Sequence, residues 1–212
     1  MQQLTQKLKS GMMTILEVPI PALSSRHILV KNYYSLISAG TESSTVKAAR
    51  KSLIGKAKER PQQVKQVLET LKKQGIVQTY RAVMKKLDTH SPLAYSSVGE
   101  VIDLAKDVDK FKIGDFVACG GLTASHSEIV CVPVNLCVKI NPDTDFKQAA
   151  YNSLGAIAMQ GVRQVDLHLG ETCAIIGLGL LGQLCALLLR VSGVKVIGID
   201  IDQVMIEIAK GN

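Results

Sequence analysis

The hydrophobic and polar positions of this chain change their pattern twice. The first 38 residues and residues 97–140 carry short apolar runs with strand character, separated by turns that contain glycine or proline. Between about Val46 and Leu87 the apolar residues recur at helical spacing, with Pro61 suited to a helix start and Gly75 to a helix stop. From residue 146 onward, helical and strand-like segments alternate. The pattern predicts a mixed α/β chain with a β-rich first part.

The predicted elements have definite bounds. We predict strands over residues 2–9, 14–18, 27–38, 97–104, 116–119, 127–134 and 136–140. We predict a linking helix over residues 146–165. A strand, a helix over 180–191, a strand over 195–200 and a further helix starting at 201–209 follow it.

A glycine-rich turn is the most informative motif in the chain. Residues 173–182 have the sequence Cys-Ala-Ile-Ile-Gly-Leu-Gly-Leu-Leu-Gly, an apolar strand that runs into the spacing G-x-G-x-x-G. Gly177 allows the sharp turn from strand to helix, Gly179 lets the backbone approach a pyrophosphate, and Gly182 lets the helix pack closely on the strand. The phosphates would lie at the helix N-terminus, where free N–H groups and the helix dipole favour negative charge.

The strand after this turn ends in an acidic residue. Asp200 lies 18 residues beyond Gly182, close to the roughly 20 residues at which a carboxylate meets the ribose hydroxyls. A carboxylate there would repel a 2′-phosphate, so the sequence favours NAD over NADP as cofactor. Asp200 could also cap the helix that follows, and the two roles are compatible. The predicted cofactor-binding residues are Gly177, Leu178, Gly179, Leu180, Leu181, Gly182, Asp200 and Ile201.

Composition limits the class of protein. The 212 residues are 47% hydrophobic, which is typical of a globular chain, and no apolar run approaches the length of a membrane span. Residues 1–10 are polar and alternating, so we expect no signal peptide. The five cysteines contain no C-x-x-C pair and lie mostly in apolar strands and the glycine-motif helix, which favours reduced, buried thiols. We therefore expect a cytoplasmic protein without a membrane partner.

The net charge of +7 is concentrated in one segment. Between Val46 and His90 there are 12 lysines and arginines against 3 acids, which gives +9, and the rest of the chain has 13 against 15, which gives −2. These charges are interleaved with apolar stripes, and Tyr80 is the only aromatic residue among them, a pattern typical of a solvated helix face. We expect no nucleic-acid partner. Attraction of an anionic substrate by this segment stays an open alternative.

Several further motifs accompany the glycine-rich turn. They are Ile-Ser-Ala-Gly-Thr-Glu at residues 37–42, Ser-Val-Gly-Glu-Val at 97–101, Phe-Lys-Ile-Gly-Asp-Phe-Val at 111–117, the helix at 149–163 and Gly-Glu-Thr-Cys-Ala-Ile-Ile-Gly at 170–177. In these motifs the chain resembles the medium-chain dehydrogenase/reductase family, which includes zinc alcohol dehydrogenases and zinc-free quinone reductases.

The resemblance implies two domains with the active site between them. A GroES-like β-barrel domain would cover residues 1–145, with a basic helical insert at about 46–90, and an incomplete Rossmann domain would cover residues 146–212. The first motif, the insert and residues 94–97 look most like the dehydrogenase module of two-part bacterial oxidoreductases.

The chain departs from the zinc enzymes of that family at each ligand position. Ser38 replaces the family's cysteine, Tyr95 stands where a Gly-His-Glu histidine would be, and Asn152 falls at the third position. Hydroxyl, phenol and amide groups do not form a catalytic zinc site, so the resemblance implies a zinc-free member without metal ligands. Hydrogen-bond donors would then stabilise the developing oxyanion. The candidate catalytic residues are Tyr95, Ser38, Asn152 and Thr41, the last matching the family's proton-relay hydroxyl.

Three of these four candidates also have a purely structural interpretation. Ser38 could bond nearby backbone, Tyr95 could belong to a packed wall, and Asn152 could cap or bridge the linking helix. Glu42 matches the acidic neighbour of the family's relay threonine. His126 precedes a strand near the expected active site and could act as an acid or base, but a histidine in an exposed turn is the favoured interpretation.

Together these features predict an NAD(H)-dependent oxidoreductase that moves a hydride between the nicotinamide and a small carbonyl, alcohol or activated alkene. The resemblance adds a sugar-derived substrate as an option. A doubly wound fold needs several parallel strands and this chain supplies two, so we expect either a C-terminally truncated chain or a partner chain that completes the sheet. The alternative function is a nucleotide-binding or interaction module without turnover. Homo-oligomerisation stays open.

Overall fold

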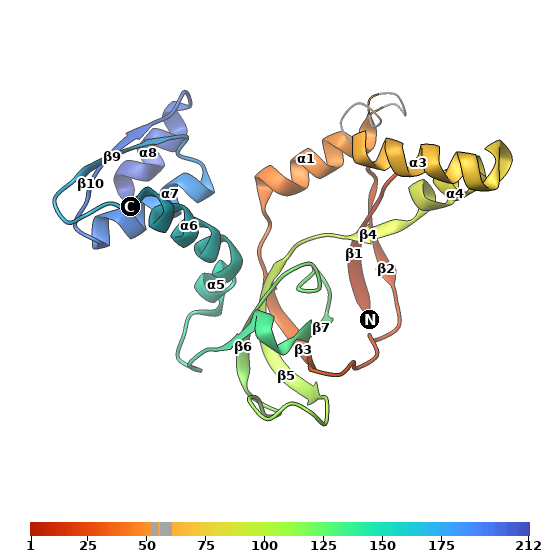
Figure 1. Cartoon of the computed structure of the whole chain (residues 1–212). Coiled ribbons are helices and arrows are strands. Elements are labelled where there is room, and N and C mark those ends of the chain that lie inside the picture. Colours follow the sequence, from red (N-terminus) through yellow and green to blue (C-terminus); the bar gives the residue numbers. More distant parts are fainter. Residues whose placement is uncertain (52–54, 56–60) are drawn as a thin grey trace.

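The computed structural model describes residues 1–51, 55 and 61–212, and it has three sheets joined by helices (Figure 1). A β-rich part holds a three-stranded and a five-stranded sheet, and helices between residues 39 and 88 extend from it. A two-stranded parallel sheet with its own helices lies to one side of this part (Figure 1). The predicted mixed α/β class is confirmed.

The larger sheet is antiparallel and holds the core of the β-rich part. Its strands, in the spatial order β7-β3-β5-β6-β8, are β3 His27–Ser35, β5 Ser96–Leu104, β6 Phe116–Gly120, β7 Ile129–Pro133 and β8 Cys137–Lys139. The core residues that are fully buried include Ile28, Val30, Val101, Val117, Cys119 and Val132. The five predicted strands are confirmed, with ends that shift by up to three residues.

The smaller sheet joins the start of the chain to the segment that leads into the larger sheet. Its strands, in the order β2-β1-β4, are β1 Gln2–Lys7, β2 Met13–Glu17 and β4 His90–Pro92. The sequence predicts the first two. It misses β4, because three residues that end in a proline carry no alternating pattern. This strand pairs with residues 5–7 of β1 and so returns the chain from the helices to the β-rich part.

The helical segment begins earlier than the apolar spacing predicts. Its described helices are α1 Ala39–Arg50, α3 Pro61–Gln74 and α4 Ile76–Asp88. The start at about residue 46 is therefore wrong by seven residues, because the first turn of α1 has no apolar stripe. The predicted helix stop at Gly75 is confirmed, with φ +79° between α3 and α4. Residues 52–54 and 56–60 of the predicted insert lie outside the described residues. Among the described helices, none has the length and apolar character needed to cross a membrane.

The predicted linking helix over residues 146–165 is wrong as a single element. The structure has two helices there, α5 Phe146–Ala149 and α6 Asn152–Val165. At the break between them, Ser96 Oγ donates a hydrogen bond to the Ala150 carbonyl at 2.7 Å and accepts one from the Ser153 N–H at 3.2 Å. These two hydrogen bonds hold the junction between α5 and α6 against the start of β5. The local sequence carries no signal for them, because Ser96 lies more than 50 residues away.

Ser96→Ala is expected to destabilise the protein by about 2 kcal/mol, because it leaves the Ala150 carbonyl and the Ser153 N–H without their buried partner. Ser96 is 1% exposed, so water does not replace the hydroxyl. Urea unfolding measures the change. Ser43→Ala, at an exposed position of α1, is the control and should stay within about 0.5 kcal/mol of the unmodified protein. Equal stability of the two variants would show that this fastening contributes nothing.

Residues 172–211 form a strand–helix–strand–helix unit. Its elements are β9 Thr172–Ile176, α7 Leu180–Val191, β10 Lys195–Ile199 and α8 Gln203–Gly211. The two strands pair in parallel, and α7 packs between this sheet and α6. The other face of the pair carries Ile176, Ile197 and Ile199, which are 85%, 54% and 48% exposed. The predicted order of elements is confirmed, and one apolar sheet face is open.

Candidate active site

The glycine-rich turn has the local geometry that its motif requires. Gly177 has φ +98°, a left-handed conformation that favours glycine. A Cβ on Gly182 would overlap the carbonyl oxygen of Gly177, so the close approach of α7 to β9 depends on glycine there. Gly179, the N-cap of α7, has no atom within 4 Å of the place where a Cβ would be. The turn is tight on its inner side and open at the helix start.

The backbone of Leu178, in the middle of this turn, is held from both sides. Its N–H donates a hydrogen bond to Asp200 Oδ2 at 2.6 Å, and its carbonyl oxygen accepts one from Gln183 Nε2 at 2.8 Å. Asp200 thereby ties the end of β10 to the turn. The sequence does not single out Gln183, because a glutamine directly after the last glycine of the motif is not part of any pattern that predicts a contact with Leu178.

The carboxylate of Asp200 stays ionised at neutral pH. The N–H groups of Asp202 and Leu178 donate hydrogen bonds to it, and they lower the pKa of Asp200 below its ordinary value. The alternative role for Asp200, as the cap of the next helix, is wrong. That helix begins at Gln203, and its N-cap is Asp202, whose Oδ1 accepts a hydrogen bond from the Val204 N–H at 2.9 Å.

The surroundings of the turn fit an adenine dinucleotide. The N-terminus of α7 has no side-chain cap, so its first N–H groups are available to a pyrophosphate beside Gly179. Leu180 and Leu181 are 38% and 41% exposed, and Ile201 is fully exposed. Apolar side chains at these places can cover an adenosine group, and the ionised Asp200 lies at the same edge.

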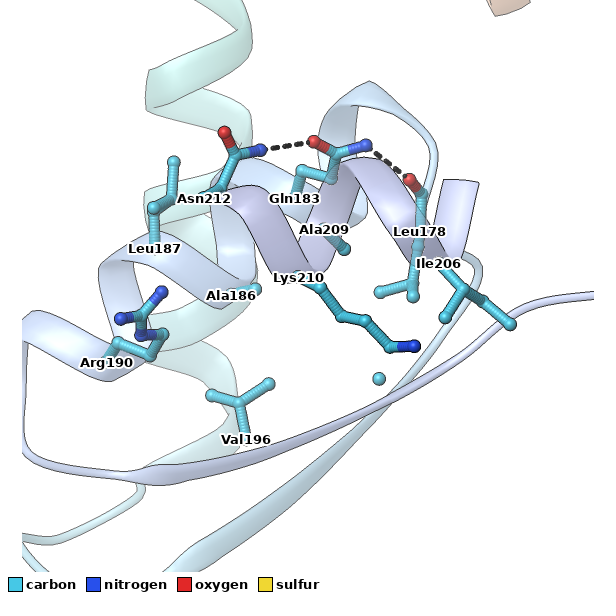
Figure 2. Close-up of a pocket in the computed structure, with 11 residues that line it drawn as sticks. Leu178, Gln183, Ala186, Leu187, Arg190, Val196, Ile206, Ala209, Lys210 and Asn212 are labelled. Carbon is cyan, nitrogen blue, oxygen red and sulfur yellow. Dashed lines mark hydrogen bonds between the residues drawn. The ribbon is translucent and has the colours of Figure 1, made fainter. Parts of the chain in front are cut away.

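A hollow of about 230 Å³ lies between α7, β10 and α8 (Figure 2). Its lining is mostly apolar and includes Leu178, Ala186, Leu187, Val196 and Ile206. Figure 2 shows Gln183 at its edge, linked to the Leu178 carbonyl and to Asn212. Gly177, Gly179 and Asp200 do not line it. Of the eight predicted cofactor-binding residues, only Leu178 lines this hollow, so it lies beside the predicted cofactor position and does not coincide with it.

A second polar cluster brings together two of the four predicted catalytic residues. Tyr95 Oη donates a hydrogen bond to Ser38 Oγ at 2.9 Å. Ser38 is 7% exposed, whereas Tyr95 is partly exposed. The phenol therefore has one buried partner and stays within reach of a small molecule.

The backbone before Tyr95 is strained. Ala94 is buried and has φ +75°, a left-handed conformation that costs a residue with a Cβ about 1 kcal/mol. The Tyr95 carbonyl oxygen accepts a hydrogen bond from Ser153 Oγ of α6 at 2.9 Å. The strain and this bond together fix the backbone that carries the phenol, and strain of this kind is concentrated at functional sites.

The other two predicted catalytic residues lie outside the Tyr95–Ser38 pair. Asn152 Nδ2 donates hydrogen bonds to the carbonyl oxygens of Ser97 and Ala149, both at 3.2 Å, and so bridges β5 and α6. Its structural interpretation accounts for these contacts. Thr41 is exposed in the first turn of α1, and within the described part of the chain its hydroxyl makes no hydrogen bond to Tyr95 or Ser38.

The expectation for His126 is wrong. An exposed turn is the favoured interpretation of this histidine, but only 10% of its side chain is exposed. Its Nε2 lies 3.4 Å from Glu42 Oε1, and the same carboxylate oxygen accepts a hydrogen bond from the Ser38 N–H at 3.0 Å. His126 and Glu42 are 84 residues apart, so no local spacing could reveal their pairing.

Hydrogen-bonding groups stand where the family resemblance implies zinc ligands, at Ser38, Tyr95 and Asn152. Over residues 1–51, 55 and 61–212, no three His, Cys, Asp or Glu side chains are grouped closely enough to hold a metal ion.

Comparison with known proteins finds dehydrogenases and quinone oxidoreductases. D-guloside 3-dehydrogenase of Shigella flexneri is 31% identical over 105 residues, which are 49% of this chain and 30% of that protein. The crystal structure of galactitol-1-phosphate dehydrogenase from Escherichia coli has a TM-score of 0.74 at 15% identity, over 100% of this chain and 59% of that one. Escherichia coli quinone oxidoreductase in complex with NADPH has a TM-score of 0.73 at 14% identity, over 100% and 56%. No family model matches the chain.

The resemblance to the medium-chain dehydrogenases/reductases is confirmed. The chain has the medium-chain fold, with the GroES-like barrel first and a Rossmann strand–helix–strand unit after it. It spans less than two thirds of the length of these relatives.

Within the medium-chain fold, the two clusters belong to different parts of the chain. Tyr95 and Ser38 lie on the barrel, and the glycine-rich turn lies on the Rossmann unit. Helix α6 connects them, because its start is fastened to β5 through Ser96 and its body packs against α7 (Figure 1).

Proposed function

We propose that this protein is a zinc-independent oxidoreductase that moves a hydride between NAD(H) and a small carbonyl, alcohol or activated alkene. The observation that carries the proposal is the hydrogen bond between Tyr95 and Ser38, in a chain that also has the glycine-rich turn with Gly177 at φ +98°. We propose the domain bounds 1–145 and 146–212. We also propose a cytoplasmic location, which the five free cysteines support.

The glycine-rich turn would hold the coenzyme. The N-terminal N–H groups of α7 would bind the pyrophosphate, and Asp200 would accept hydrogen bonds from the ribose hydroxyls. Bound there, NAD(H) supplies or accepts the hydride. The ionised Asp200 would repel the 2′-phosphate of NADP, which supports NAD as the cofactor.

Tyr95 is the proposed proton donor. In carbonyl reduction the hydride goes to the carbonyl carbon, and Tyr95 Oη gives its proton to the carbonyl oxygen. Solvent then returns a proton to the phenol, and in alcohol oxidation the proton moves in the opposite direction. Before the reaction the only hydrogen of this phenol is donated to Ser38 Oγ, which holds the hydroxyl in one position. When a carbonyl compound binds, the O–H would turn from Ser38 to the carbonyl oxygen and then give up its proton.

A sugar-derived compound is the substrate class that we propose. The relative that is 31% identical over 49% of this chain is a guloside dehydrogenase by name. The charge of +9 between residues 46 and 90 would favour an anionic sugar such as a sugar nucleotide.

The test is oxidation of NADH by the purified protein with a panel of ketones, oxidised sugars and quinones, after its metal content has been measured. We expect turnover with at least one carbonyl compound, from protein that holds far less than one metal ion per chain and is insensitive to a chelator. Binding of NADH without any turnover would favour the alternative of a non-catalytic nucleotide-binding module. Turnover that a chelator abolishes would overturn the proposal that the reaction is independent of zinc.

Asp200→Asn is expected to narrow the preference for NADH over NADPH by about tenfold, because the neutral amide no longer repels a 2′-phosphate and binds the ribose hydroxyls less well. The lowered pKa of Asp200 means that the preference of the unmodified protein should not change between pH 6 and pH 9. Fluorescence titration with both coenzymes measures the ratio. Asp103→Asn, at an exposed position of β5, is the control with an unchanged ratio. If Asp200→Asn has the same ratio of NADH to NADPH affinity as the control, Asp200 does not contact the adenosine ribose.

A further inference from the structure

His126 is fixed in place by contacts on several sides. Its Nδ1 lies 2.7 Å from Ser35 Oγ, at the end of β3. Its backbone N–H donates to the Leu93 carbonyl at 2.9 Å, and its carbonyl oxygen accepts from the Leu4 N–H at 2.8 Å. Because the side chain is nine-tenths buried, the imidazole has one well-defined orientation.

The second ring nitrogen of His126 is directed at Glu42. Nε2 is buried and has no hydrogen-bond partner among the described residues, yet it lies 3.4 Å from Glu42 Oε1. Only 15% of the Glu42 side chain is exposed. If the Ser35 hydroxyl donates to Nδ1, the ring proton resides on Nε2 and faces the carboxylate. A small shift of either side chain would complete a charge-assisted hydrogen bond.

Glu42 connects this histidine to the proposed proton donor. Its Oε1 accepts a hydrogen bond from the Ser38 N–H at 3.0 Å, across the first turn of α1. The hydroxyl of Ser38 in turn accepts the hydrogen bond of Tyr95 Oη at 2.9 Å. The contacts therefore run from His126 through Glu42 and Ser38 to Tyr95, across elements that are remote in the sequence.

We propose that His126 is a positioning residue: through Glu42 it holds Ser38 in the place where Ser38 fixes the hydroxyl of Tyr95. This role rests on the proposed function of Tyr95 as proton donor. His126 itself does not exchange a proton with the substrate. Its ring keeps the Glu42 carboxylate over the Ser38 N–H, and without it that carboxylate can turn toward solvent.

Two substitutions of His126 separate the Glu42 contact from the Ser35 contact. In His126→Gln the side-chain amide reaches about as far as Nε2 and can still donate to Glu42. In His126→Asn the shorter amide reaches only the region of Nδ1, so it keeps the Ser35 contact and loses Glu42. We expect kcat to fall on the order of tenfold to a hundredfold in the Asn variant, with KM and NADH affinity nearly unchanged, and to recover largely in the Gln variant.

A second readout does not depend on turnover. Hydrogen exchange of the Ser38 amide, followed by NMR, should be slow in the unmodified protein and in His126→Gln, and faster in His126→Asn. His168→Asn is the matched control, because His168 also lies within 4 Å of a glutamate, Glu171, but 77% of its side chain is exposed. That control should change neither kcat nor the exchange of Ser38.

Equal behaviour of the Asn and Gln variants, in kcat and in Ser38 exchange, would overturn the proposal. If either variant does not fold, Glu42→Gln and Glu42→Met test the same link from the other side. The Gln side chain keeps an acceptor for the Ser38 N–H and should keep slow exchange, whereas Met removes it and should give fast exchange; equal exchange in these two variants would also overturn the proposal. A protein without any turnover but with the expected exchange pattern would refute the proposed function and leave the positioning role intact.

Discussion

Gly182→Ala is expected to weaken NADH binding by about a hundredfold or more. The added Cβ would overlap the carbonyl oxygen of Gly177, so α7 must move away from the turn or the turn must open. Overpacking of this kind costs about 3 kcal/mol, which corresponds to about a hundredfold in affinity if the strain is released by distortion of the binding turn. Isothermal titration calorimetry of the variant with NADH measures the loss.

The control for this variant is another glycine-to-alanine change. Gly161 lies inside α6 with no atom within 4 Å of its Cβ position, so alanine fits there and should stabilise the helix by roughly 1 kcal/mol. Gly161→Ala should bind NADH as the unmodified protein does. If Gly182→Ala also retains full affinity, the glycine-rich turn is not the coenzyme site.

Tyr95→Phe is expected to lower kcat by about a hundredfold, because a positioned general acid contributes on the order of a hundredfold or more to the rate. The phenyl ring fills the same space, so NADH affinity should change little, and the free energy of unfolding should fall by only about 1 kcal/mol because the buried Ser38 hydroxyl loses its hydrogen bond. Steady-state kinetics with the best carbonyl substrate, at saturating NADH, measure the effect. Tyr80→Phe, on the exposed face of α4, is the control with unchanged kcat.

If Tyr95→Phe has the same kcat as the control variant, Tyr95 is not the proton donor.

Ser38→Ala tests the hydrogen-bond partner of Tyr95 separately from Tyr95 itself. It leaves the phenol in place without its acceptor, so we expect a decrease in kcat of about tenfold, smaller than that of Tyr95→Phe.

The geometry of the glycine-rich turn can be predicted from the sequence because its determinants are local. Gly177 and Gly182 act on atoms within six residues of each other, and the strand, helix and strand around them follow from apolar periodicity. Asp200 is further along the chain, but the length of one helix and one strand fixes its distance. Its bond to the Leu178 N–H, and the opposing bond from Gln183, depend on side-chain packing and could not be predicted.

The polar cluster around Tyr95 can be predicted only in part. The family resemblance singles out Ser38 and Tyr95 because they stand at metal-ligand positions, whereas their hydrogen bond spans 57 residues and has no periodic signal. The sequence misplaces His126 for the same reason: a turn residue is expected to be exposed, whereas contacts with Ser35 and Glu42, which are remote in the sequence, bury its side chain. The break in the linking helix has a comparable cause, since Ser96 reaches it from another strand.

The most direct test of the account is a crystal structure of the protein grown with NADH. We expect the pyrophosphate at the N-terminus of α7 beside Gly179, the adenosine ribose within hydrogen-bonding distance of Asp200, and the nicotinamide ring next to the hydroxyl of Tyr95. NADH bound elsewhere, or a nicotinamide ring remote from Tyr95 and Ser38, would contradict it.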